Sequence, residues 1–138
     1  MNPEVAEQIS QTIRNAPLVP TTAAESFVER MSAVPLEENL AFPVRVDRRR
    51  ESVAAAIRLV ALNAEMAGTI RGVLDRSALP VPGDPHDEAF HTRVRAELEA
   101  AILGVLPELP SASEADGWGE IAQIVAGSLF GASLKAAA

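Results

Sequence analysis

The chain has 138 residues, of which 12 are basic and 19 acidic, giving a formal net charge of −7 at pH 7. The acidic balance works against nucleic acid or anionic lipid as a partner. The absence of cysteine excludes disulfides, thiolate metal sites and thiol catalysis.

Proline placement divides the chain into helical segments. The ten prolines lie outside five stretches, 4–16, 21–34, 44–79, 86–106 and 111–138. Because proline interrupts a helix interior at a cost of about 3 kcal/mol but is tolerated in first turns and connectors, this placement predicts five helices. We expect one helical domain over 1–138, an all-α fold that is bundle-like or orthogonal and has one long central helix.

The first two helices carry clear start signals. Asn2 can cap a helix with Pro3 at its first position. Thr22 and Glu25 match a capping box, which predicts that the second helix begins there and ends near Ala33. The apolar stripe of the first helix is Val5, Ile9, Ile13 and Ala16.

The third helix is expected to be the longest. Residues 35–47 show no sustained period and are interpreted as an irregular connector. Asp47 can cap a helix that runs to about residue 79, which would be roughly 45 Å long at 1.5 Å per residue. Most directions around it are apolar, so it is central to the fold or to an interface.

Two further helices follow the proline-rich loop at 80–85. Asp84 and Pro85 predict the start of the fourth helix, which runs to about Leu106. The polar stretch 111–116 is expected to lead into a fifth helix around Trp118 to Lys135. The apolar stripe of the fourth helix is Phe90, Val94, Leu98, Ala101, Ile102 and Val105.

Small residues mark candidate interfaces on the third and fifth helices. Glycine in a helix interior costs about 0.5–1 kcal/mol relative to alanine, so close approach of another backbone is the simplest offsetting gain. That neighbour is a helix of the same subunit or a second copy of the chain. Trp118, between two glycines, is either an interface residue or a plug in the core. The candidate interface residues are Ala61, Gly68, Gly72, Gly127, Gly131 and Trp118.

Four polar residues are candidates for a ligand pocket. Asp87 lies one turn before His91 and can orient its imidazole, and Asn63 and Arg71 interrupt an apolar sector of the third helix. Together they would hold a small acidic or carbonyl-bearing ligand. Alternatively His91 is a hydrogen-bonded structural residue and Arg71 extends to solvent. Further ligands at suitable spacing are missing, so we expect no metal and no cofactor.

Arg45, Arg48, Arg49 and Arg50 form one basic cluster. Arginine suits phosphate contacts, so nucleic acid or a phosphorylated ligand is one interpretation. The net charge and the lack of interleaved aromatic residues favour a solvated or ion-paired run instead, and a nucleic-acid partner is not expected.

No catalytic motif stands out, and the sequence therefore favours a non-catalytic helical interaction or regulatory module that associates with itself as a homodimer or with another protein. The alternative is a small-molecule sensor or a simple acid–base enzyme using His91. Nothing resembles a signal peptide or a membrane span, so we expect a cytoplasmic protein. Arginine outnumbers lysine by eleven to one, which suggests a GC-rich bacterial genome.

Overall fold

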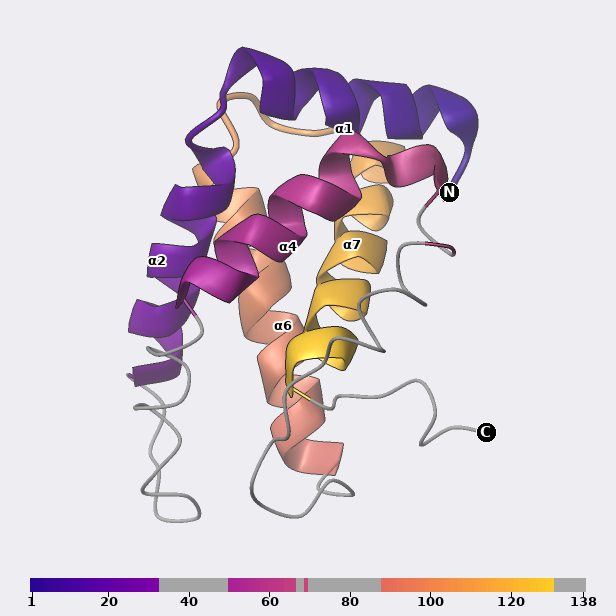
Figure 1. The fold of residues 1–138 in the computed structure, drawn as a ribbon. Helices are drawn as coiled ribbons and strands as arrows, with labels where there is room; N and C mark the ends of the chain where they lie inside the picture. Colours follow the sequence, from indigo (N-terminus) through magenta and orange to yellow (C-terminus); the bar gives the residue numbers. More distant parts are fainter. Residues whose placement is uncertain (33–49, 67–68, 70–87, 131–138) are drawn as a thin grey trace.

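Five α-helices and one short 3₁₀ helix make up the described part of the chain (Figure 1). The computed structural model describes residues 1–32, 50–66, 69 and 88–130. The predicted all-α, bundle-like fold is confirmed over these residues. The elements are α1 (Pro3–Asn15), α2 (Val19–Ser32), α4 (Arg50–Leu62), the 3₁₀ helix η1 (Ala64–Met66), α6 (Glu88–Val105) and α7 (Ala112–Phe130).

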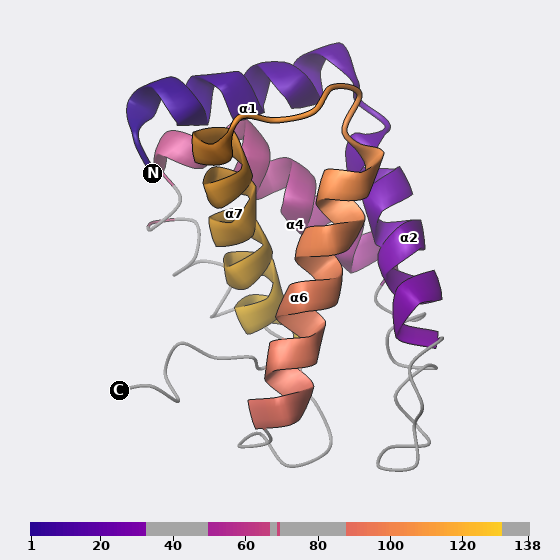
Figure 2. The same cartoon turned by 180° about the vertical axis from the view of Figure 1, so that it is seen from behind.

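Helix α1 lies across one end of the other helices and contacts α4, α7 and η1 (Figures 1 and 2). The predicted cap is confirmed, because Asn2 Oδ1 accepts hydrogen bonds from the amides of Glu4 at 2.8 Å and Val5 at 3.2 Å. The predicted stripe is confirmed as well, since Ile9 and Ile13 are fully buried. Pro17 prevents the helix from continuing beyond its cap residue.

Helix α2 begins at Val19, so the start predicted at Thr22 is wrong. The amide of Thr22 donates to the carbonyl of Leu18 at 2.9 Å, which places Thr22 inside the first turn and not at a cap. Pro20 also lies in this turn. Proline is tolerated there because the N–H groups of a first turn make no hydrogen bond within the helix. The helix packs against α4 and α6.

Helix α4 ends at Leu62, so the prediction of an uninterrupted helix from Asp47 to about residue 79 is wrong at Asn63. The Asn63 amide bonds to the carbonyl of Val60 at 3.2 Å, three residues back, and the chain tightens into η1. Asparagine favours such a change because its side chain competes for backbone groups. Helix α4 is nevertheless central, since it contacts α1, α2 and α7. Residues 47–49 lie outside the described part of the chain.

Helices α6 and α7 pack side by side and are joined by a short connector (Figure 2). The predicted apolar stripe of α6 is confirmed at Val94 and Leu98, which are fully buried. Helix α7 begins at Ala112, so the start predicted near Trp118 is wrong. Ser111 Oγ accepts from the Glu114 amide at 3.2 Å and caps the helix at this earlier position.

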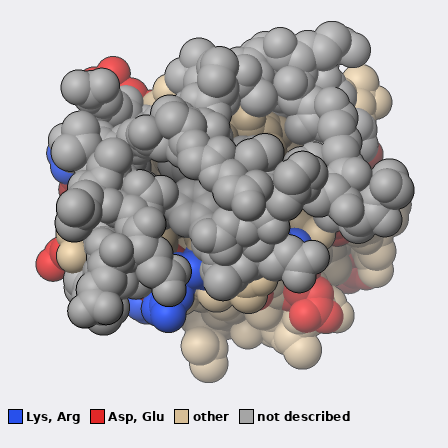
Figure 3. Space-filling view, turned by 90° about the horizontal axis from the view of Figure 1, so that it is seen from below, with Lys and Arg blue, Asp and Glu red and all other residues tan. Residues whose placement is uncertain are grey.

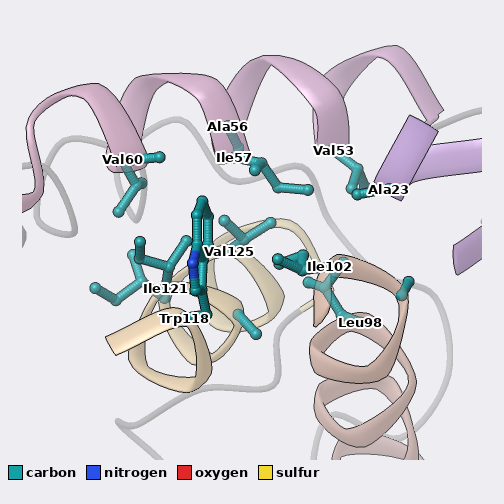
Figure 4. Packing of buried hydrophobic residues seen from close by; sticks show 14 of the residues in the cluster. Ala23, Val53, Ala56, Ile57, Val60, Leu98, Ile102, Trp118, Ile121 and Val125 are labelled. Carbon is teal, nitrogen blue, oxygen red and sulfur yellow. The ribbon is translucent and has the colours of Figure 1, made fainter. Parts of the chain in front are cut away.

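All five described helices contribute to the core, and Figure 4 shows the part of it between α4, α6 and α7. Figure 4 shows the ring of Trp118 extending from α7 toward α4, beside Val60 and Ile57. These three side chains are each 0% exposed. Burying one large apolar side chain contributes about 1.5–3 kcal/mol to the free energy of folding. Aliphatic residues fill most of the remaining volume, as the low aromatic content predicts.

Candidate functional site

Asn63 is the one member of the predicted polar pocket whose side chain the structure describes. Arg71, Asp87 and the side chain of His91 lie outside the described residues. The exposed Asn63 donates through Nδ2 to the carbonyl of Leu59 at 2.9 Å, so one of its amide hydrogens is used within its own turn. A ligand pocket around His91 therefore stays a prediction.

Asn63 lines a shallow hollow of about 180 Å³ between α1 and η1. Ser10 also lines it, is 5% exposed, and has no hydrogen-bond partner for Oγ among the described residues. The charged residues at this hollow are Glu7, Arg14 and Glu65. This mixture gives the hollow no clear preference for an anionic or a cationic ligand.

Ala61 and Trp118 face the interior of the chain, which corrects their placement on an interface. Both are 0% exposed, so neither side chain is available to a second subunit. The alternative interpretation of Trp118 as a core plug agrees with this burial. Gly127 is half-buried on α7. Gly68, Gly72 and Gly131 lie outside the described residues.

Close helix contacts within the subunit occur at Gly117 and Gly119, two glycines other than those for which the sequence predicted them. A Cβ built on Gly117 would lie 2.8 Å from Ile9 Cδ1, and one on Gly119 would lie 2.9 Å from Glu99 Oε1. The first contact joins α7 to α1 and the second joins α7 to α6. Gly117 therefore serves packing within one chain, whereas the neighbour of Gly119 is the end of a flexible glutamate side chain.

A groove forms where the connector between α1 and α2 meets the connector between α6 and α7. Figure 2 shows the second connector running along α1 at the end of the molecule. The first hollow of the groove has a volume of about 320 Å³ and a mostly apolar lining. Its lining residues are Ala16, Pro17, Leu18, Val19, Thr22, Val105 and Pro107.

A second hollow, of about 340 Å³, adjoins the first. Ala16 and Pro107 line both, so the two hollows form one surface feature, which we call the connector groove. The remaining residues of the second hollow are mostly polar: Gln11, Thr12, Asn15, Leu106, Glu108, Leu109 and Glu114.

Two exposed leucines flank the connector groove. Leu18 is 73% exposed and Leu109 is 97% exposed, the two highest values among the large hydrophobic residues described. The sequence held a signal for both, because each leucine lies within a Pro-x-x-Pro segment, 17–20 and 107–110. Because proline fixes its own φ angle, the prolines at the ends of each segment restrict the backbone conformations that the segment can adopt around its leucine.

The basic cluster is described only at Arg50. Arg45, Arg48 and Arg49 lie outside the described residues. Arg50 is exposed at the first position of α4. Seen from the end opposite α1, basic and acidic side chains of the described residues both reach the surface (Figure 3). Phosphate binding by this cluster stays untested.

Within the described residues, no three metal-binding side chains come together. None of the described helices is long and apolar enough to cross a membrane. Comparison of the chain with protein-family models, curated proteins and solved structures found no match.

Proposed function

We propose that the protein is a non-catalytic helical interaction module that docks a short segment of a partner polypeptide in the connector groove. The observation that carries this proposal is the exposure of Leu18 in the apolar first hollow and of Leu109 in the adjoining second hollow. A single exposed leucine is ordinary on a protein surface, but two exposed leucines that line adjoining hollows support a binding site.

The energetics favour a weak and specific contact. Burying a leucine side chain contributes about 1.5–3 kcal/mol, part of which offsets the loss of free motion on association. The prolines at 17, 20, 107 and 110 lower the ordering cost, because both connectors are already restricted before binding. We therefore expect a transient interface at the small end of the known range.

The groove suits a peptide segment better than a second copy of this chain. Its hollows, of about 320 and 340 Å³, accommodate individual side chains. A second copy that docked through the same surface would bring two acidic rims together, Glu108 and Glu114 on each, in molecules of net charge −7. Like charges at an interface oppose such pairing.

Peptide display on the purified chain, followed by fluorescence anisotropy of the enriched peptides, tests the proposal. We expect the double variant Leu18→Ser, Leu109→Ser to weaken binding at least about tenfold, since about 1.4 kcal/mol of lost burial has that effect. Leu59→Ser is the matched control, because Leu59 is 41% exposed on α4 and lines neither hollow. Failure to enrich any peptide, or equal binding by the double variant, would contradict the proposal.

Self-association through small-residue helix faces is a separate part of the proposed function. Among the described residues it is supported by Gly127, which is half-buried, and by Gln123, which lies one turn earlier and is also half-buried. A partly open glycine allows the backbone of another helix to approach closely. This surface is distinct from the connector groove.

A further inference from the structure

We infer that the segment docked in the connector groove is cationic and amphipathic, with an arginine or lysine next to an apolar side chain. This inference rests on the proposed function and adds the chemistry of the partner. It follows from the side-chain charges and the hydrogen-bond acceptors of the second hollow, which we call the polar hollow, the first being the apolar hollow.

The side-chain charge in the connector groove is negative. Glu108, which is exposed, and Glu114, which is half-buried, both line the polar hollow. No lysine or arginine lines either hollow among the described residues. An incoming cation would therefore meet two carboxylates without a competing positive charge, and charge-assisted hydrogen bonds to carboxylates are stronger than neutral ones.

Four helix ends lie at the connector groove, and their partial charges offset one another. Helix α1 ends at Asn15, which lines the polar hollow, and α6 ends at Val105, which lines the apolar one. The last carbonyls of a helix lack helical partners, and each carboxyl end carries about half a negative charge. Helix α2 begins at Val19, which lines the apolar hollow, and Glu114 in the first turn of α7 lines the polar one, so two amino ends with partial positive charge lie there as well. The preference for a cation therefore rests on the side-chain carboxylates.

Two of the three polar side chains that α1 contributes to the polar hollow use a donor within their own helix. Thr12 Oγ1 donates to the carbonyl of Gln8 at 3.0 Å, and Gln11 Nε2 donates to Glu7 Oε1 at 3.0 Å. Thr12 and Gln11 can therefore accept more further hydrogen bonds than they can donate, and the two carboxylates can only accept them. A guanidinium, which has five donors and no acceptor, is the best complement to such a lining.

The arrangement of the two hollows indicates that an apolar side chain accompanies the cation in the docked segment. Because Ala16 and Pro107 line both, a segment that places a cation in the polar hollow places its neighbouring side chain over the apolar one. Leu18 and Val105 there offer apolar surface. An anionic ligand such as a phosphate chain would be repelled by the carboxylates.

Anisotropy with three short labelled peptides of equal length tests this inference: one of arginine and leucine, one of glutamate and leucine, and one of arginine and serine. We expect the first to bind most tightly. The variant Glu108→Gln, Glu114→Gln should weaken its binding about fivefold, which corresponds to about 0.5 kcal/mol for each charge removed. Glutamine at position 114 keeps the capping-box pattern with Ser111, so α7 should stay intact.

The control variant Glu51→Gln, Glu65→Gln removes the same net charge from residues that line neither hollow. It should change the affinity less than twofold. If both leucine-containing peptides bind equally and only Leu18→Ser, Leu109→Ser weakens them, the cationic preference is wrong and the docking function stands. If no peptide binds, or the leucine variants have no effect, the docking function fails together with the inference.

Discussion

Ile9 of α1 lies directly against the backbone of Gly117 in α7: a Cβ built on Gly117 would come within 2.8 Å of Ile9 Cδ1 and 2.9 Å of Val5 Cγ1. Ile9 is 0% exposed. Helix α1 can therefore pack this closely across α7 only because position 117 has no side chain. This contact joins the first helix of the chain to the last described one.

We expect Gly117→Ala to lower the free energy of unfolding by about 1 kcal/mol. Alanine improves helix propensity by about 0.5–1 kcal/mol, but overpacking a fitted contact costs about 1–3 kcal/mol. Val5 and Ile9 are both β-branched and stiff at χ1, so only Cδ1 of Ile9 can move, by rotation about the next side-chain bond. Urea denaturation of the variant and the parent measures the difference.

Gly104→Ala is the matched control for that substitution. Gly104 is exposed in the last turn of α6, and a Cβ built on it would have no atom within 4 Å. Alanine there should raise the free energy of unfolding by about 0.5 kcal/mol through propensity alone. A gain in stability at both positions would contradict the close contact between Ile9 and Gly117.

The described helices could be predicted from the sequence because their signals are local. Asn2 followed by Pro3 defines the start of α1, and the spacing of Val94 and Leu98 defines the buried face of α6. Ser111 and Glu114 form an equally local capping box, but the polar residues that follow have the composition of a loop and conceal the start of α7. The hydrogen bond from the Glu114 amide shows that the cap prevails over the composition.

The candidate site was harder to predict because it depends on which connectors meet. Leu18 and Leu109 are 91 positions apart in the sequence, and no local pattern shows that both border one groove. The end of α4 at Asn63 is equally hard to foresee, since helix periodicity continues through it while a single side chain diverts the backbone hydrogen bonds. Tertiary contact decides the first feature, and a local side-chain hydrogen bond decides the second.

The cap of α1 gives a second stability prediction. Asn2→Ala should lower the free energy of unfolding by about 1 kcal/mol, because two amides of the first turn lose the oxygen that accepts their hydrogen bonds. Asn2→Ser should cost less, since serine caps nearly as well. Urea denaturation compares the three chains, and equal stability of all three would contradict a structural role for the cap.

Trp118 gives a spectroscopic prediction. The indole is 0% exposed, and its Nε1 has no hydrogen-bond partner among the described residues. We expect blue-shifted emission that acrylamide quenches much less than free tryptophan, with both properties lost on unfolding in urea. Because it is the only tryptophan of the chain, the signal has one source. Efficient quenching of the folded protein would place the ring at the surface and contradict the packing in Figure 4.

Self-association predicts a particle of twice the 14.6 kDa chain mass in light scattering at high protein concentration. Gly127→Leu should shift this mass toward that of the monomer, because a leucine side chain prevents close approach of a second helix backbone to α7. Gly104→Leu is the control, since Gly104 is an exposed helix glycine on α6. Circular dichroism should show both variants folded. A parent protein that stays monomeric would remove self-association from the proposed function, while peptide binding at the connector groove would be unaffected because Gly127 lines neither of its hollows.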